Sequence, residues 1–334
     1  MKKIACATLL LLALAGCKEK TKETKMASPK IETHTVCMGR QQLEMPTSFV
    51  LAEETNGMFK LLDMGSKDPA IEVAVHAATL DASGFAAALG QRHAELSKPD
   101  SLGMDVLRLE KNLSPEATLY RVQRVDDAYV SEINFLAGGN LVRASLKSFH
   151  DKFLNAEEKL VAFTQRVTVH KSSGNPAGGF CLGQVTLSGD FTAESVSALY
   201  QSTEHKGTVF NLEIDSFAPD ESVSLFDRMS GPDSLLTKFK ADVKVLRKRE
   251  LTISGMHAQE WLGSILLGEH QDEKKFGFAM ETMRPAPGKL TPRMHLSFDT
   301  GQQLPDGSVD SFVMPDAQAV ALWDSVVSSI QPAP

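Results

Sequence analysis

The stretch Cys37-Met38-Gly39-Arg40 returns in altered form as Cys181-Leu182-Gly183-Gln184, at an offset of 181 − 37 = 144 positions. A second pair of landmarks keeps the same order, with Val106-Leu107-Arg108 matched by Val245-Leu246-Arg247 at an offset of 245 − 106 = 139. Solenoid repeats have periods of about 20 to 50 residues, so this much longer period indicates two copies of one domain. The alternative is chance similarity between short apolar runs.

The first half has the pattern of an antiparallel sheet. Ile71, Val73 and Val75 alternate with polar or small residues, which is typical of a half-buried strand. The strands expected after it are joined by connections of turn length, whereas a parallel crossover needs about a dozen residues or more. These further strands are expected at 104–110, 117–125, 130–137 and 141–149.

Helices are expected to pack on this sheet. Asp81 can cap a helix that contains Phe85, and Asn155 followed by Glu158 has the capping-box pattern of a second helix. The second half repeats the order with strands around 276–280 and 294–298 and a last helix at 316–330. Trp323 lies on the apolar stripe of that last helix, which favours core packing over ligand stacking.

The sequence therefore predicts an α+β fold of two tandem duplicated domains, each an antiparallel sheet packed with helices. The domains are expected at 31–170 and 179–331, and the Ser-, Gly-, Asn- and Pro-containing segment 171–178 is expected to be a hinge. A chain of 334 residues with 42% hydrophobic content is large enough for two such cores.

Residues 1–16 have the layout of a bacterial lipoprotein leader. A positive start, Met1-Lys2-Lys3, precedes an apolar stretch that is too short to span a bilayer, and Leu14-Ala15-Gly16 stands before Cys17. The pattern resembles a lipobox, in which the cysteine receives diacylglycerol, the leader is cut before it and the new amine is acylated. We therefore expect lipidation at Cys17 and a membrane-tethered mature protein; an ordinary secretory leader cleaved elsewhere is the alternative.

Residues 17–30 are expected to form the lipidated cysteine and a flexible tether, because they are polar and mixed in charge. Lys18 follows the cysteine, and by resemblance to sorting in two-membrane bacteria a residue other than Asp favours the periplasmic leaflet of the outer membrane. Loss of the leader leaves a net charge of (35 − 2) − 42 = −9. This acidic balance argues against a nucleic-acid partner.

Cys37 and Cys181 are the cysteines that remain after the leader is removed and Cys17 is assigned to lipid. In an oxidising compartment they are candidates for one disulfide between the two halves. The alternative is that both are small buried hydrophobic residues at equivalent strand positions. Sequence alone leaves both interpretations open, because a disulfide requires a specific geometry.

The chain lacks the common sequence patterns of catalysis and cofactor binding. It has no Gly-x-Ser-x-Gly, no phosphate-binding glycine loop and no close pair of His or Cys with metal-ligand spacing. Asp126-Asp127 and the acidic stretch 306–310 are interpreted as solvated turns. We therefore expect no catalytic residue, no cofactor and no metal, although a site assembled by the fold from distant residues stays open.

Several short segments form a specific order along the chain. They are Cys37-Met38-Gly39-Arg40, Leu43-Glu44-Met45-Pro46, Gly179-Phe180-Cys181, Phe278-Ala279-Met280-Glu281-Thr282, the stretch 292–301 and Ala321-Leu322-Trp323-Asp324. In this order the segments resemble the immunity proteins that protect bacteria from type VI secretion phospholipase effectors. The resemblance covers about residues 30–331 and departs from the family pattern at Glu44, Met45 and Gln184.

The resemblance implies a periplasmic two-domain clamp that grips the lid or mouth of a lipase and performs no chemistry. A large interface of this kind would use loops at the rim between the domains. The residues expected to contact the partner are Met58, Lys60, Met64, Lys67, Asp272, Lys274, Met283 and Arg284. Two other functions remain open: a non-catalytic envelope scaffold or chaperone, and a lipoprotein hydrolase with a non-standard site.

Overall fold

The computed structural model describes residues 31–333 except positions 100, 102 and 105 and the segments 170–177, 218–222, 231–241, 268–272, 284–287 and 303–313. The expected leader and tether (1–30), nearly all of the expected hinge, Asp272, Arg284 and the acidic stretch 306–310 lie outside the described residues. Residues from Ile31 onward form one compact unit.

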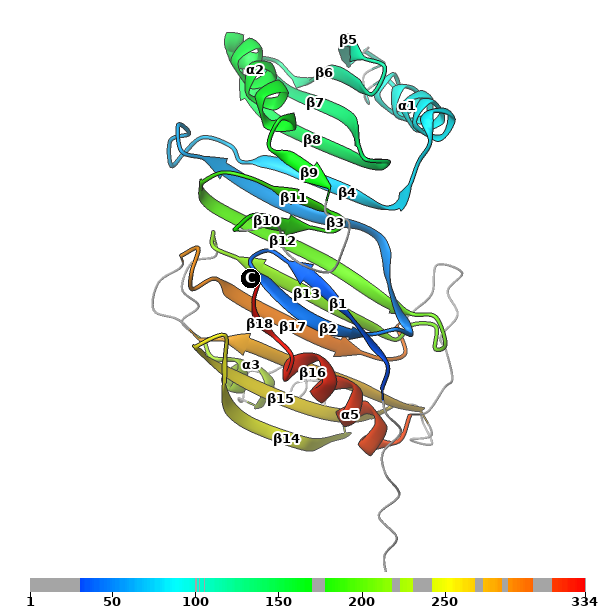
Figure 1. Cartoon of the computed structure of the whole chain (residues 1–334), viewed down its shortest axis with the longest axis vertical. Helices are drawn as coiled ribbons and strands as arrows, with labels where there is room; N and C mark the ends of the chain where they lie inside the picture. The colour runs from blue at the N-terminus through cyan, green and yellow to red at the C-terminus, as the bar shows by residue number, and fades with distance from the viewer. Residues whose placement is uncertain are drawn as a thin grey trace, which may run out of the picture. The chain divides into compact units, whose positions relative to one another are not determined.

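Strands and helices alternate in the same order in both halves (Figure 1). The first half contains β1 (Thr33–Met38), β2 (Gln41–Pro46), β3 (Phe49–Leu61), β4 (Ile71–Thr79), α1 (Ala82–Leu96), β5 (Leu107–Ser114), β6 (Ala117–Val125), β7 (Ala128–Ala137), β8 (Asn140–Phe149), the short helix η1 (His150–Lys152), α2 (Phe153–Thr164) and β9 (Val167–Val169). The second half contains β10 (Phe180–Leu182), β11 (Val185–Leu187), β12 (Phe191–Ser202), β13 (Val209–Asp215), α3 (Leu225–Ser230), β14 (Asp242–Ile253), β15 (Met256–Leu267), β16 (Glu273–Thr282), β17 (Arg293–Asp299), α5 (Asp316–Val327) and β18 (Gln331–Pro332).

Twelve strands form one antiparallel sheet, in the order β14-β15-β16-β17-β13-β12-β3-β4-β8-β7-β6-β5. The order is symmetric about its centre, because each strand of one half has its counterpart at the same distance from the β3–β12 pair. The fold of each half is therefore a copy of the other, as the repeated sequence pattern predicted. At the centre, β3 and β12 pair antiparallel from Phe49↔Ser202 to Leu61↔Phe191 with two irregularities in register.

The expected arrangement of two separate domains, 31–170 and 179–331, as a clamp is not visible in this architecture. Both halves contribute six strands to a continuous sheet, and β3 of the first half is bonded along its length to β12 of the second. Hydrophobic alternation shows which residues of a strand face the core, but it carries no information about which strand pairs with which edge. The domain boundaries stay a prediction. The structure does contain antiparallel sheets packed with helices, which is the expected α+β fold class.

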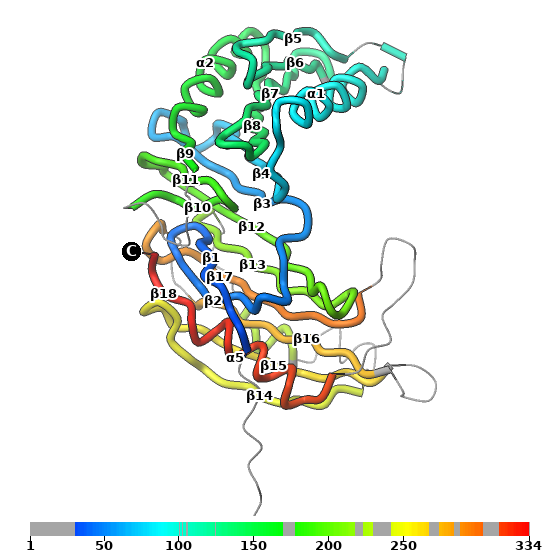
Figure 2. The backbone as a smooth tube through the Cα atoms, turned by 45° about the vertical axis from the view of Figure 1, so that its right-hand side comes forward, coloured from blue at the N-terminus to red at the C-terminus, as the bar shows by residue number. Residues whose placement is uncertain are grey.

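Two small sheets exchange strands between the halves. The hairpin β1–β2 begins the first half and pairs with β18, the last strand of the second half. The hairpin β10–β11 begins the second half and pairs with β9, the last strand of the first. Figures 1 and 2 show both small sheets against the same face of the large sheet. The last strand of each half is therefore paired with the first hairpin of the other half.

The large sheet has two different faces. Its core face packs α2, α5 and the small sheets into the main hydrophobic cluster, which contains Leu119 and Leu262. The neighbouring residues Tyr120 and Trp261 point the opposite way and pack in separate clusters with residues of α1 and α3. Successive side chains of a strand point to opposite faces, so α1 and α3 lie on the second face, which we call the open face.

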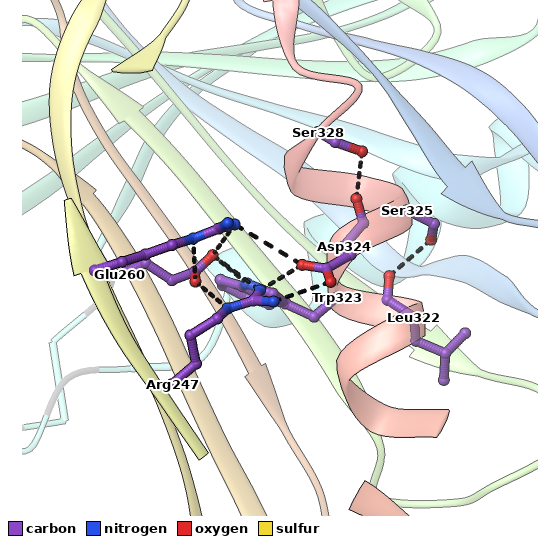
Figure 3. A network of polar contacts seen from close by, with 8 residues as sticks. Arg247, Glu260, Leu322, Trp323, Asp324, Ser325 and Ser328 are labelled. Carbon is purple, nitrogen blue, oxygen red and sulfur yellow. Dashed lines mark hydrogen bonds and ion pairs between the residues drawn. The ribbon is translucent and has the colours of Figure 1, made fainter. Parts of the chain in front are cut away.

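A buried ion-pair network fixes α5 on the core face (Figure 3). The carboxylate of Glu260 is fully buried and accepts hydrogen bonds from Arg247 Nε at 2.6 Å, Arg249 Nε at 2.9 Å and the indole Nε1 of Trp323 at 3.0 Å. Arg247 also donates to Asp324 of α5 at 3.0 Å. Trp323 is therefore a core residue, as its place on the apolar stripe predicted. The network satisfies a charge that would be costly to bury alone.

The helix starts agree only partly with the sequence patterns. Asp81 caps α1 as expected, and its side chain accepts a hydrogen bond of 2.8 Å from the Gly84 N–H. The capping-box prediction at Asn155 is wrong, because α2 already begins at Phe153 and has no side-chain cap. The preceding turn η1 continues directly into the helix, so the chain enters α2 before Asn155 is reached.

Cys37 and Cys181 form a disulfide bond that joins β1 to β10, with the Cα atoms 5.7 Å apart. Beside it, the Gly39 N–H donates to the Cys181 carbonyl at 2.9 Å and the Cys181 N–H donates to the Gly39 carbonyl at 2.8 Å. Gly39 and Gly183 both have φ of +60°, which favours glycine at the first position of each two-residue hairpin turn. In both copies, the repeated Cys-x-Gly is therefore the end of a strand followed by the first residue of a tight turn.

We expect the double substitution C37A/C181A to lower the free energy of unfolding by about 3 to 5 kcal/mol, because the bond closes a loop of more than a hundred residues. Urea denaturation of the oxidised protein and the variant measures this difference. The reduced wild-type protein is the control and should behave like the variant. Equal midpoints for all three would contradict a stabilising role for the bond.

Candidate functional site

The open face of the sheet is uncovered between α1 and α3. At its centre lies a groove of about 460 Å³ formed by β3, β4, β7, β8, β12 and β13 together with α1. Most of the residues that line it are polar. The lining residues are Glu54, Asn56, Gly57, Met58, Glu72, Val73, Ala74, Arg92, Glu132, Arg143, Ser145, Ser195, Val196, Ser197 and Glu213.

Strand alternation explains why these side chains meet here. On β4, Ile71, Val73 and Val75 are buried, whereas Glu72 and His76 point to the open face. An antiparallel sheet commonly has one solvated face, so polarity by itself does not mark a site. Several large apolar side chains are exposed on this face, among them Met58 at 39% and Leu199 at 40%.

An ion-pair network anchors α1 at one side of the groove. Glu132 of β7 is buried and accepts hydrogen bonds of 2.8 Å from both Arg92 Nε of α1 and Asn134 Nδ2. Arg143 Nε lies 3.6 Å from Glu132 and donates to Asn134 at 3.2 Å. The hydrogen bond to Glu132 raises the pKa of Arg92 above its usual range, although burial opposes this. These groups are occupied with one another and hold the helix in place.

A related network anchors α3 on the other side. Glu281 of β16 is 6% exposed and interacts with Arg228 of α3, with Arg293 at 3.4 Å and with His295 Nδ1 at 2.8 Å. Burial disfavours the charged form of Glu281, but the hydrogen bonds from His295 and Arg228 outweigh it and bring its pKa to about 2. Burial also raises the pKa of Asp299, in the last position of β17.

Between these networks the floor of the groove is acidic. Glu54 lies 3.8 Å from His76, and Glu72 is paired with Lys147 at 2.6 Å. Glu213 has no ion pair among the described residues. The arrangement is suited to binding cationic or hydrogen-bond-donating groups.

The described part of the chain contains no group of three His, Cys, Asp or Glu side chains placed to hold a metal ion. None of its helices is long and apolar enough to cross a membrane. The groove itself is lined by serines, carboxylates and arginines without a histidine or cysteine. The carboxylates, arginines and serines of the groove offer charged and hydrogen-bonding groups to a ligand or partner.

The residues predicted to contact a partner do not lie together. Met58 lines the groove, whereas Lys67 lines a different pocket beside α2. Lys60 Nζ donates to the Ser66 carbonyl at 2.6 Å, and Lys274 of β16 pairs with Asp316 at the start of α5. Met283 follows β16, and its N–H donates to the His257 carbonyl at 2.7 Å.

Met64 is only 8% exposed and packs in the main core, so in this structure it is not a surface contact as predicted. Its thioether accepts the Leu61 N–H at 3.3 Å, which folds the turn after β3 inward. Asp272 and Arg284 lie outside the described residues. For the remaining members of the set, contact with a partner stays a prediction.

The partner-contact prediction did not include the acidic residues of the groove, because it was confined to expected loops. Glu54, Glu72 and Glu213 lie on strands and were seen only as the polar half of an alternating pattern. Glu213 and Glu54 come from different halves and meet in one groove because β13 and β3 flank β12. The sequence did not predict that strands of the two halves pair with each other. It therefore gave no sign that Glu54 and Glu213 lie in one groove.

The pKa of Glu281 predicts a specific loss of stability in acid. Its folded pKa of about 2 lies below the ordinary glutamate pKa of 4.5, so its stabilising effect is complete above pH 4.5 and disappears as the pH falls through 2. We expect the free energy of unfolding to fall by about 3 kcal/mol in this window from this group alone. Urea denaturation at pH 5, 4, 3 and 2 measures it.

Glu281→Gln should flatten the dependence between pH 4.5 and 2, at the cost of lower stability at pH 7. The control is Glu250→Gln, which removes a carboxylate that is 61% exposed. If both variants keep the wild-type slope, Glu281 is not the group that titrates.

Comparisons with known proteins agree with the fold. Residues 176–334 match the model of the family described as Tle cognate immunity protein 4 C-terminal domain. No curated protein matches the chain.

Three solved structures share the fold. The apo structure of the immunity protein TplEi of the type VI secretion system from Pseudomonas aeruginosa has a TM-score of 0.64 and 19% identity, and the alignment covers 90% of this chain and 97% of that one. A crystal structure of a Tle4–Tli4 complex gives a TM-score of 0.64 and 19% identity, with 90% and 98% covered. TplEi complexed with an "L" peptide gives 0.60 and 18%, with 90% and 98% covered.

At these identities the structural matches establish the fold, and the family match covers nearly half of the chain. Both agree with the resemblance drawn from the repeated Cys-x-Gly and the segments that follow it. The resemblance to the immunity proteins of type VI secretion phospholipase effectors is thus confirmed by the match of residues 176–334 to the model described as Tle cognate immunity protein 4 C-terminal domain and by the shared fold.

Proposed function

We propose that this protein binds a type VI secretion phospholipase effector and inhibits it without catalysis, protecting the cell that makes both. The observation that carries the proposal is the match of residues 176–334 to an immunity-protein domain, together with a fold shared along 90% of the chain with a structure solved as a Tle4–Tli4 complex. The absence of the common catalytic patterns from the sequence is consistent with it.

We propose the open face as the surface that meets the effector. Its centre is a groove whose floor carries Glu54, Glu72 and Glu213, and α1 and α3 are tied to the sheet by ion pairs on either side. Met58 and Leu199 provide exposed apolar side chains among these polar groups. Interfaces commonly combine a few apolar anchors with a polar surround, and both are present on this face.

The charge of the groove favours a basic segment of the effector. Of its charged groups, Arg92 and Arg143 are engaged with Glu132, so the carboxylates of Glu54 and Glu213 are the ones left to meet a partner. The whole chain has a formal charge of −7, which adds long-range attraction for a basic partner. Such complementarity mainly increases the rate of association and the specificity.

Reversing the acidic floor should weaken the complex. We expect Glu54→Lys with Glu213→Lys to lower the affinity for the cognate phospholipase effector at least tenfold, mainly through slower association at low salt. Surface plasmon resonance at two salt concentrations measures it. The matched control is Glu116→Lys with Glu158→Lys, which makes the same charge change at exposed positions away from the groove.

Two outcomes would contradict this assignment. If control and groove variants lose affinity equally, net charge and not the groove is responsible. If the unaltered protein fails to bind and inhibit the phospholipase, and deletion of its gene leaves cells resistant to their siblings, the immunity function itself is refuted. Recovery of an envelope assembly protein in place of a lipase would favour the scaffold or chaperone alternative.

We further propose that the mature protein is a lipoprotein held in the periplasm by Cys17, with the outer membrane as the expected site. The support is the leader-like sequence before Cys17 and the disulfide between Cys37 and Cys181, since such bonds persist in oxidising compartments. An anchor of this kind would keep the inhibitor beside the lipid that a phospholipase attacks.

Substitution of Cys17 should release the protein from membranes. We expect Cys17→Ser to abolish incorporation of labelled palmitate and to move the protein from the membrane fraction to the soluble fraction. Fractionation with immunoblotting measures both. Cys6→Ser, inside the expected leader, is the control and should leave the protein in the membrane fraction; unchanged labelling of Cys17→Ser would refute the anchor.

A further inference from the structure

A second pocket, separate from the groove on the open face, lies between the turn after β3 and the first half of α2. It has a volume of about 580 Å³, within the usual range for small-molecule sites. The end of β8 and the short helix η1 complete its wall. None of the residues that line the groove on the open face lines this pocket.

The pocket is positively charged on an acidic protein. Four lysines line it, against two aspartates, Asp63 and Asp68. Lys159 is paired with Asp63, and Lys147 is paired with Glu72 at 2.6 Å. Lys67 and Lys152 have no hydrogen bond or ion pair among the described residues, so two ammonium groups are left for a ligand.

A buried hydroxyl in the same wall also lacks a partner. Ser148, on β8, is 7% exposed, and its Oγ has no hydrogen bond among the described residues. Leaving a buried polar group unsatisfied costs about 1 to 3 kcal/mol, so natural structures usually provide it with a partner. Because Ser148 lines the pocket, an oxygen of a ligand bound there would be that partner.

The start of α2 adds a third attraction for negative charge. The helix has no side-chain cap and no acidic residue in its first turn, although Asp151 stands in η1 just before it. Asn155 and Ala156 of the first turns line the pocket. The positive end of the helix dipole favours an anion at this end.

We propose that this pocket binds a phosphate group, carried either by a free phosphate ester or by a phospholipid headgroup. Phosphate offers several acceptor oxygens, which suits donors that approach from different elements: Lys67 from the turn after β3, Lys152 from η1 and Ser148 from the sheet. Phe149 is 55% exposed at the pocket and supplies an apolar contact for the remainder of an ester.

Titration of the full chain with three soluble probes tests the proposal and separates the two sources. The probes are inorganic phosphate, glycerol 1-phosphate and dihexanoyl phosphatidylglycerol below its micelle concentration, followed by isothermal calorimetry and by the melting temperature. We expect saturable binding and a rise in melting temperature. Preference for the phosphatidylglycerol over glycerol 1-phosphate identifies a lipid headgroup, and the reverse identifies a free ester.

Lys67→Gln with Lys152→Gln should weaken phosphate binding at least tenfold. The control, Lys111→Gln with Lys206→Gln, removes the same charge at exposed positions outside the pocket and should bind like the unaltered protein. Ser148→Ala should lower the affinity several-fold while stability is unchanged or higher, because it removes an unsatisfied hydroxyl. If Ser148 had only a structural role, its substitution would not lower the phosphate affinity while leaving the stability unchanged.

Absence of saturable binding for all three probes would overturn the proposal. Equal weakening by the pocket and control variants would also overturn it, since the effect would then be general charge screening. If phosphate fails to bind but the pocket variant loses affinity for a protein partner, the pocket is a protein contact and the proposal is wrong.

Discussion

The structure depends on the antiparallel pairing of β3 with β12. This pair runs from Phe49↔Ser202 to Leu61↔Phe191 and turns two six-stranded halves into one sheet. Because the pair is antiparallel and each strand is the counterpart of the other, it creates the symmetric strand order. Aromatic side chains of the two halves also pack together at this junction. The ring centroid of Phe59 on β3 lies 5.1 Å from that of Phe180 and 4.9 Å from that of Phe191, both in the second half.

The exchange of terminal strands strengthens this junction. Each starting hairpin pairs with the final strand of the other half, and the Cys37–Cys181 bond joins the two hairpins. Arg40 adds a two-point contact to Glu194 of β12, at 2.6 and 2.9 Å. The equivalent position in the second hairpin is Gln184, so this contact is made once and the symmetry is broken there. Contacts of this kind make the halves interdependent, which argues for cooperative unfolding of residues 31–333.

The same sheet separates the two surfaces for which binding is proposed. The open face is acidic between two helices that ion pairs hold to the sheet, and it gathers residues from both halves. The lysine-lined pocket belongs to one half and lies beside α2, a core-face helix. The proposed protein partner at the groove and the proposed phosphate group at the pocket would therefore be bound by opposite charges.

The sequence by itself determined the local and periodic features: the duplication, the alternating strands, the Asp81 cap, the core position of Trp323 and the leader-like start before Cys17. These follow from side-chain period, turn chemistry and spacing, which are properties of neighbouring residues. Only the tertiary structure decided that the halves share one sheet, that Cys37 reaches Cys181 and that Glu54 and Glu213 meet in one groove. Strand partners, and the surfaces they build, are set by hydrogen bonding and packing between residues far apart in the chain, and a local pattern does not encode them.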